Sequence, residues 1–421
     1  MKILLIFLTF SVSLNVLSYD VVGRFKTVQD KLATDELFRP IGHDFVFEVG
    51  ASLNADITDV IDDAEKAADT PGSESDKIAA ATTFLRKYEN TEQNVRVNFK
   101  LGFPLPSFMV GNTKLRPNIR AIGDVGFILG IRKDKVDFSN ILELVGNEIP
   151  QVVKNKILEL EQAGSFVAGN DMVSVACTSL GLPLNTPACP TEYLNKYFYP
   201  DEDIPNIFAL GKAQAKAGMF NNFYNKKHGF FGKLNAYAMV RGDRLVRLSQ
   251  YSISKDGEFV DLDKKFAVQT SLALDLIYGQ KFRNWKVWGG AEELKVFTLS
   301  DNEDEAGELV YGNKPLLRLQ GEGEYNFGVV KFVPYAGIHK RSGYDFDQGV
   351  YGGFKASLGF LGDRIVTSLR AQVDKEHITI APQFKLWVMQ LDYSLKAPMS
   401  STVDNNVKVS TIHNVNLRFF F

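Results

Sequence analysis

The chain has 421 residues, with 48 Lys and Arg against 50 Asp and Glu and a formal net charge of -2. This near balance argues against a nucleic-acid-binding protein, whose surface usually carries a strong basic excess. Hydrophobic residues make up 45% of the chain, yet the mean hydropathy is only -0.10. Beyond the N-terminus no apolar run reaches the roughly 18 residues of a transmembrane helix, although a membrane β-barrel, apolar only at every second strand position, is compatible with this composition.

The N-terminal residues have the three parts of a secretory signal. Lys2 supplies the positive charge, residues 3–17 form the apolar stretch, and residues 16–18 form a cleavage site before Tyr19. We therefore predict that residues 1–18 are a signal peptide removed on export; the alternative is a buried N-terminal strand or helix. Residues 19–42 are then expected to form an N-terminal periplasmic segment, in which apolar residues recur at roughly helical spacing.

Strict alternation of apolar and polar residues begins at residue 44, where Phe45, Phe47 and Val49 alternate with polar side chains. Such period-two patterning is typical of a β-strand with two unlike faces. The pattern predicts fourteen strands, near residues 44–57, 95–105, 115–131, 209–220, 229–253, 265–278, 285–298, 315–326, 329–340, 349–360, 364–374, 376–386, 389–396 and 407–421. This number requires residues 229–253 to form one long bent strand, because a turn at residues 241–243 would invert every strand upstream.

Two long insertions interrupt the strands. Residues 58–92 are charged, with helical stretches on either side of Pro71-Gly72, and residues 133–208 contain an amphipathic helix near 140–161. Short connections such as Gly362-Asp363 are typical of the periplasmic side of a barrel, and long connections of the outside. We therefore expect both insertions to be extracellular, and the N-terminus and Phe421 to be periplasmic.

The two faces of the strands favour lipid over a soluble core. In residues 364–374, Ile365, Leu369 and Val373 lie on one face, with Arg364 and Arg370 on the other. A soluble β protein can share this pattern, but only a closed barrel satisfies every backbone group, as a bilayer demands. The predicted fold class is all-β: a transmembrane antiparallel β-barrel of about 14 strands, formed by residues 43–421, with a partly helical insertion.

Cys177 and Cys189 lie close together in the second insertion. In an oxidising compartment a bridge between them would stabilise the loop by about 3 kcal/mol on the chain-entropy model. Two residues are too few for a metal site. We predict a structural disulfide.

The last strand carries Val415, Leu417, Phe419 and Phe421 on one face, with polar residues between them. This strand resembles the C-terminal signal of bacterial outer-membrane barrels, in which a terminal Phe follows alternating apolar residues and is recognised by the barrel-assembly machinery. The resemblance implies the cell outer membrane of a Gram-negative bacterium. It also implies outer-membrane lipid, lipopolysaccharide and the assembly machinery as partners, and no nucleic acid.

The strand number, the N-terminal segment and the hairpin containing "MQLDYSL" resemble the fourteen-stranded long-chain fatty-acid transporter group. This resemblance is topological and covers mostly residues 315–421. The Asn-Pro-Ala motif of that group's N-terminal hatch is absent from the chain, so no functional residue is carried over.

The sequence contains no pattern that indicates catalysis. The five histidines are scattered, without partners at metal-ligand spacing. The acidic run 301–305 has Ala306 where a calcium loop needs Gly, and Arg241-Gly242-Asp243, although it matches an adhesion tripeptide, is better explained as part of a strand. We expect no enzyme, no metal and no cofactor.

Basic residues are predicted to line the lumen, and they outnumber the inward-facing acidic residues by about two to one, as in pores whose fixed charges select ions. The members of this set that we single out are Arg96, Lys100, Arg120, Arg318, Lys331, Lys355, Arg370, Lys385 and Arg418. The alternative is that these side chains pair across the lumen and plug it.

The leading functional prediction is a channel or transporter for small solutes, with an anion-leaning lumen. A second reading is a transporter of hydrophobic compounds, which move through a plugged barrel with a lateral opening. A third is a structural or surface-recognition barrel without transport, in which residues 133–208 form the recognition module.

Phe421→Asp removes the aromatic residue that the assembly machinery is expected to recognise. Near the rim a charge on the lipid face costs less than the about 2–4 kcal/mol of a basic residue at the midplane. Fold stability should therefore change modestly, while the yield of membrane-inserted protein, measured by fractionation, falls severely. Phe420→Asp is the control, since Phe420 is expected to face the lumen; insertion of both variants at the wild-type level would contradict the assembly signal.

Overall fold

The computed structural model describes residues 20–38, 44–133, 149–189, 199, 204–248, 266–360, 364–403 and 406–421. The predicted signal peptide, residues 1–18, lies outside the described residues and stays a prediction. The same holds for the first half of the helix expected near 140–161.

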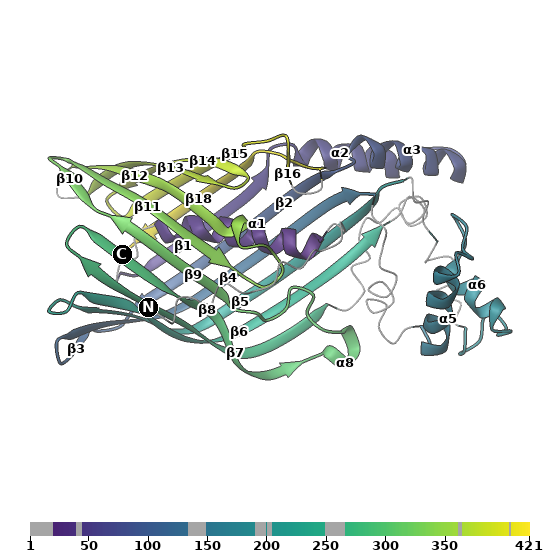
Figure 1. Ribbon diagram of the computed structural model, residues 1–421, viewed down its shortest axis with the longest axis horizontal. Coiled ribbons are helices and arrows are strands. Elements are labelled where there is room, and N and C mark those ends of the chain that lie inside the picture. The colour runs from purple at the N-terminus through teal and green to yellow at the C-terminus, as the bar shows by residue number, and fades with distance from the viewer. Residues whose placement is uncertain are drawn as a thin grey trace, which may run out of the picture.

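Fourteen antiparallel strands form one closed sheet, in which β1 pairs with both β2 and β18 (Figure 1). The predicted fold class is confirmed, and each predicted strand has its counterpart. The wall consists of β1 (Val46–Asn54), β2 (Thr91–Pro104), β4 (Thr113–Arg132), β5 (Asn206–Asn225), β6 (Phe230–Leu248), β7 (Ala267–Phe282), β8 (Trp285–Asp301), β9 (Leu316–Gly323), β11 (Val330–Lys340), β12 (Val350–Phe360), β13 (Ile365–Asp374), β14 (His377–Leu386), β15 (Met389–Pro398) and β18 (Ile412–Phe420).

Four short strands extend the wall at its ends: β3 (Phe108–Val110), β10 (Tyr325–Phe327), β16 (Thr402–Val403) and β17 (Val407–Val409). Strand β6 pairs without interruption with β5 and β7 through residues 241–243, so it is one strand, as the fourteen-strand count requires. The side chains of Arg241 and Asp243 are buried, which excludes the adhesion-tripeptide reading.

The wall has an apolar outer face and a polar inner face. In β1, Val49 and Leu53 are 41% and 42% exposed, whereas the residues just before each of them, Glu48 and Ser52, are buried. The same alternation places Val97, Val125, Leu234, Leu319 and many similar residues on the outside. Apolar exposure on this scale is far beyond the isolated patches of a soluble monomer, and it matches the band that a barrel presents to lipid.

The strands differ in length around the wall. β4 and β5 each have 20 residues, and β12 to β15 have 10 or 11. A strand of 20 residues spans about 65 Å at about 3.3 Å per residue. Tilted by about 40°, it rises about 50 Å, well beyond a hydrocarbon core of about 30 Å. The wall around β4 and β5 is therefore taller than the apolar band, and these strands extend beyond it.

The two ends of the barrel are unlike. The "short-turn end" carries the tight connections after β5, β7 and β14 together with Phe421. The opposite "helix end" carries α2 (Ile57–Ala68), α3 (Glu74–Lys87), α5 (Gln151–Gln162), α6 (Met172–Ser179) and α8 (Glu303–Ala306) (Figure 1). Among the described residues, no helix combines the length and the apolar character that a membrane span requires.

The two helical insertions have small cores of their own. Cys177 and Cys189 form the predicted disulfide within a buried cluster that joins α5 to α6. In the α2–α3 hairpin, Lys87 and Tyr88 both donate to the Asp63 carboxylate. The Lys87 contact, more than any other, holds the pKa of Asp63 below its ordinary value.

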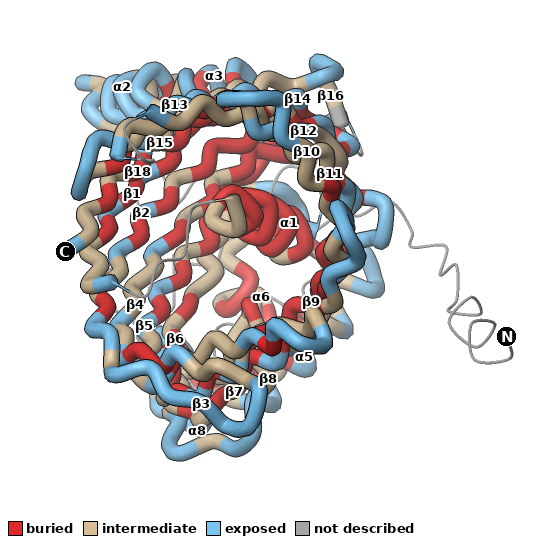
Figure 2. Tube along the Cα trace, turned by 90° about the vertical axis from the view of Figure 1, so that its left-hand side faces the viewer, coloured by how far each residue is buried: buried red, intermediate tan, exposed pale blue. Residues whose placement is uncertain are grey.

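Helix α1 (Val21–Asp35) lies inside the barrel, followed by the short η1 turn (Glu36–Phe38) (Figure 2). Its first turn contacts Glu92 at the helix end of β2, and Glu36 contacts Arg96 and Lys100 further along the same strand. The helix thus runs from the helix end toward the short-turn end. Residues 19–42 were expected to form a periplasmic segment on the same side as Phe421, but the described part of this segment lies inside the barrel. The physical reason is that charged residues of the wall form ion pairs with the charged side chains of the helix.

Val125→Arg places a charge on the outer face near the middle of β4, where Val125 is 56% exposed. If that face contacts lipid, the substitution should destabilise the barrel by about 2–4 kcal/mol, measured by urea unfolding in lipid vesicles. Val152→Arg is the matched control, because Val152 on α5 is 54% exposed outside the barrel. It should be neutral, and equal tolerance of both changes would contradict a lipid-facing wall.

Candidate functional site

The enclosed helix α1 is the most unusual part of the lumen. Asp20 caps it by accepting from the Gly23 backbone N–H at 2.8 Å, and Thr27 and Thr34 donate their hydroxyls to carbonyls one turn earlier. Gly23 allows α1 to approach the loop between β11 and β12 closely, since a Cβ at residue 23 would lie 2.1 Å from the Gly343 carbonyl oxygen. Nearly every residue of α1 is buried, charged ones included.

Ion pairs to opposite sides of the barrel hold α1 in place. Arg24 bridges Glu92 at 2.9 Å and Glu376 at 2.5 Å, and Lys31 binds Asp374 and Glu376 at 3.1 and 2.7 Å. Because these carboxylates come from β2 and from the β13–β14 turn, one helix connects strands that are distant in the sequence.

The acidic residues of α1, Asp30 and Asp35, lie in its C-terminal half, on either side of Lys31. Asp35 accepts from Arg370 at 2.6 Å and from Lys396 at 3.2 Å, and all three side chains are almost completely buried. One turn earlier, Asp30 pairs with Arg341 through both nitrogens of its guanidinium edge, at 3.0 and 3.1 Å. Charges of either sign on the helix therefore meet opposite charges on the wall.

Arg341 links α1 to a carboxylate at the centre of the lumen. It donates to Glu293 at 2.9 Å, and Glu293 also accepts from Lys216 and Arg241, each at 2.7 Å. Three cations converge on one carboxylate, so Glu293 is the hub that joins β5, β6, β8 and, through Asp30, the helix.

A β-bulge produces this hub. Leu274 pairs with Leu294 and Leu276 with Ala291, so Asp275 lies opposite two residues, Glu292 and Glu293. Glu293 has φ of 60°, and its backbone N–H donates to the Asp275 carboxylate at 2.9 Å. A bulge re-aims side chains, and here both glutamates face the lumen although they are neighbours in the sequence.

A loop between β8 and β9 folds into the lumen and closes it toward the helix end. The Asp243 carboxylate accepts from the backbone N–H groups of Val310 and Tyr311 at 2.8 and 3.0 Å. The buried Tyr311 ring contacts Phe25 of α1 edge-on, with ring centroids 5.8 Å apart. Four cations lie within 6 Å of the same ring: Lys26, Lys212, Arg241 and Arg341.

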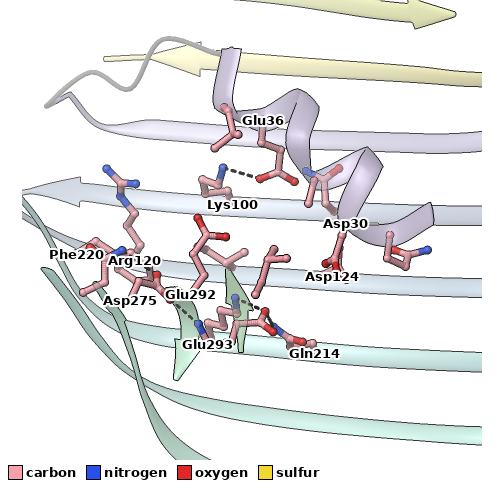
Figure 3. A pocket seen from close by; sticks show the side chains of 18 of the residues that line it. Asp30, Glu36, Lys100, Arg120, Asp124, Gln214, Phe220, Asp275, Glu292 and Glu293 are labelled. Atoms are coloured by element: carbon pink, nitrogen blue, oxygen red, sulfur yellow. Dashed lines mark hydrogen bonds and ion pairs between the residues drawn. The ribbon is translucent and has the colours of Figure 1, made fainter. Parts of the chain in front are cut away.

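A cavity of about 210 Å³ remains between α1 and the wall formed by β4 to β8 (Figure 3). Its lining extends from Tyr311 to Val46 and Gly102, so it runs toward the short-turn end. Nine basic and six acidic side chains border it. The cavity is therefore polar, with more basic than acidic side chains in its lining and with Tyr311 toward the helix end.

Most of the predicted lumen cations do face the interior. Arg96 pairs with Asp124 and Glu36, Arg318 with Glu292, and Arg370 with Asp35, while Lys100 lies 3.5 Å from Glu36. Arg418 binds Glu48, and Lys355 donates to Gln383 and to the Phe38 carbonyl. Lys331 pairs with Glu324 and is half-exposed, and Lys385 lies over the Phe420 ring near the rim.

Most of this set is therefore ion-paired, but with carboxylates of neighbouring strands and of α1 and its η1 turn rather than across an open lumen. Arg120 differs, because its one hydrogen bond among the described residues is to the Asn118 amide oxygen, at 3.1 Å. The sequence analysis also missed Arg341, Lys396, Glu293 and Glu376. Lys396 follows the period of β15 and could have been found, whereas Arg341 and Glu376 lie beyond strand ends.

The C-terminal residues lie as predicted. Val415 and Phe421 are 45% and 71% exposed, and the rings of Phe419 and Phe421 stack on the outer face. Phe420 contacts Arg418 on the inner face. Whether the assembly machinery recognises this strand stays a prediction.

Within the described ranges, no group of three or more His, Cys, Asp or Glu side chains is arranged to hold a metal ion. His339 bonds to Tyr344 and His413 to Tyr393. The expectation that the chain is not an enzyme stays a prediction.

No family model and no curated protein matches this chain. Among solved structures, the transport unit of the autotransporter AIDA-I from Escherichia coli matches with a TM-score of 0.34 and 9% identity, covering 96% of this chain and 99% of its own. CdiB from Escherichia coli matches with a TM-score of 0.35 and 8% identity over 90% and 64% of the two chains. Outer membrane phospholipase A from Escherichia coli has a TM-score of 0.27 and 11% identity over 91% and 92%. The predicted resemblance to the fatty-acid transporter group is not confirmed by these comparisons.

Asp35→Asn should loosen α1, because it leaves the buried Arg370 and Lys396 without their carboxylate. Breaking a buried ion pair costs about 3–5 kcal/mol, so amide hydrogen exchange in residues 20–38 should accelerate at least tenfold. Asp63→Asn, which removes the acceptor of Lys87 and Tyr88 outside the barrel, should accelerate exchange in α2 and α3 only. Unchanged exchange of α1 in the Asp35 variant would show that the ion pairs do not hold the helix.

Proposed function

We propose that this chain is an outer-membrane β-barrel of a Gram-negative bacterium that conducts small charged solutes through a lumen gated by α1 and Tyr311. The observation that carries the proposal is the lumen itself: a polar, net basic cavity that is blocked by a helix held largely through ion pairs. The apolar outer face of the wall and the apolar C-terminal strand support the membrane location.

A plug held by ion pairs is suited to act as a gate, because water can replace the ion-pair partners of each charged group when the helix leaves the wall. Apolar contacts between helix and wall are lost outright on separation, whereas a buried ion pair gives up attraction but regains the hydration of both charges. The apolar contacts of α1 lie at two places: Val28 and Leu32 cluster with Ile412, and Val21 and Phe25 belong to a buried cluster with Ile128, Leu210, Tyr311 and Val407. The wall that is left behind is hydrophilic, so the open state is a wetted pore.

The direction of the barrel follows from its connections. In the proposed orientation the short-turn end faces the periplasm and the helix end, with the disulfide-bonded α5–α6 module, faces outward. The cavity is then accessible from the periplasmic side, and Tyr311 closes it on the outer side. A charged lining disfavours the alternative of a hydrophobic-compound transporter, which needs an apolar site. The reading as a recognition barrel without transport predicts no conductance at all.

Locking α1 to the wall tests the gate. Gln29 lies against Gly126 of β4, where a Cβ would lie 2.8 Å from the Gln29 side chain, so the pair Gln29→Cys and Gly126→Cys places two thiols across the contact. In planar bilayers the wild-type chain should show channel openings. The doubly substituted chain should lose them when oxidised and regain them on reduction.

Two controls accompany the lock. The wild type in the same reductant reports the effect of opening the Cys177–Cys189 disulfide, and Gln29→Cys alone reports the effect of losing the glutamine. An absence of wild-type openings, or openings of equal frequency in the oxidised and reduced double variant, would overturn the proposed gate.

A further inference from the structure

We propose that Arg120 and Lys233 form a binding site for a small oxyanion in the cavity beside α1. The site deepens the proposed function and rests on it for its purpose: it would hold the solute that the barrel conducts. Its ligand class is a carboxylate or phosphate small enough for a cavity of about 210 Å³.

The charges around the cavity do not balance. Among the described residues, nine basic and six acidic side chains border it. A seventh carboxylate, Glu48, pairs with Arg418 from outside the lining, so basic side chains still outnumber carboxylates. The acidic groups are already engaged: Glu293 accepts from three cations and Glu292 from Arg318 at 3.0 Å. Asp275 accepts from Tyr237, Asn235 and the Glu293 backbone at 2.6, 2.8 and 2.9 Å.

Arg120 is held in place but is not neutralised. Its Nε donates to the Asn118 amide oxygen at 3.1 Å, and its guanidinium lies 5.6 Å from the centre of the Phe220 ring. Both contacts orient the group without supplying a negative charge, and Figure 3 shows it extending away from the wall. The Asn118 Nδ2 is buried without a hydrogen-bond partner in the described part of the chain.

Lys233 is the second cation of the cavity without a close ion pair among the described residues. On the inner face of β6, Asn235, Tyr237 and Arg241 all bond to carboxylates. Lys233 borders the cavity, and among the residues that the structure describes neither it nor Arg120 forms an ion pair. Both side chains are half-buried, and in this partly desolvated lumen an anion attracted to the two cations is held more strongly than in bulk solvent.

The donor set favours an oxyanion over other anions. The outer nitrogens of a guanidinium match the two oxygens of a carboxylate or phosphate, and an ammonium adds a point charge. The cavity volume equals that of about seven waters, at about 30 Å³ each. Succinate and inorganic phosphate are therefore suitable probes of the two possible ligand sources.

Equilibrium titration of the full chain in detergent micelles tests the site. We expect succinate, phosphate or both to bind with 1:1 stoichiometry, and ethylammonium not to bind. The double change Arg120→Gln with Lys233→Gln should weaken anion binding at least tenfold. The matched control, Lys281→Gln with Lys331→Gln, removes the same charge from two residues near the short-turn end that do not line the cavity, and it should bind as the wild type does.

Binding of succinate alone identifies a carboxylate site, and binding of phosphate alone a phosphate site; either supports the proposal. Anion binding that survives in the Arg120 and Lys233 variant, no anion binding to the wild type, or equal binding of ethylammonium would overturn it. Each variant is first shown to be folded by its heat-modifiable migration on gels. Because binding is measured without transport, the two proposals can fail separately. If the gate experiment fails, anion binding can still be observed, and if no anion binds, the channel openings can still be observed.

Discussion

Closure of the sheet between β1 and β18 is the constraint on which the rest of the structure depends. Nine residue pairs join the two strands, from Val46 opposite Phe420 to Asn54 opposite Ile412. In hydrocarbon every unsatisfied backbone group costs several kcal/mol, so a sheet without edges is the only sheet that can span a bilayer. Once the sheet is closed, strand periodicity assigns each residue either to the outside or to the lumen. The seam itself shows the outcome, because Glu48 on β1 and Arg418 on β18 meet inside.

The closed wall concentrates charge in a narrow space, and α1 is the complement of that charge. Its cations Arg24 and Lys31 meet Glu92, Asp374 and Glu376, and its anions Asp30 and Asp35 meet Arg341, Arg370 and Lys396. Buried ion pairs are weak evidence for stability, but they can specify one arrangement over others. A helix shifted by one turn would bring like charges together, so the pairs fix its depth in the lumen. The wall needs the helix equally, since without it Arg370 and Lys396 would lack their carboxylate.

The sequence predicted the wall well, because strand alternation is a local signal that closure preserves. Even β6, the weakest of the predicted strands, is continuous, since residues 241–243 keep the period of two. The contents of the lumen were predicted poorly. A helical period in residues 20–38 does not reveal whether the polar face meets water or a charged wall, so α1 was placed in the periplasm. The bulge at Glu292 and Glu293 breaks the alternation that assigns inward positions, and a strict period of two would place only one of these neighbours inside. Tyr311 lies in a segment that reads as a solvated loop, and only the hydrogen bonds from its backbone to Asp243 bring it inward.

The path of α1 also bears on how the molecule can be built. The chain crosses the tube once as α1, from the helix end to the short-turn end, and then fourteen times as wall strands that alternate in direction. The start of α1 and Phe421 therefore lie at opposite ends of the tube. A segment joined to the first strand of a ring cannot enter sideways after the ring is complete. Either α1 is in position when β1 meets β18, or it passes lengthwise through the finished tube. In the first case the strands close around their own plug, and the ion pairs of the helix act as a template that gathers β2, β13 and β15 before the seam forms.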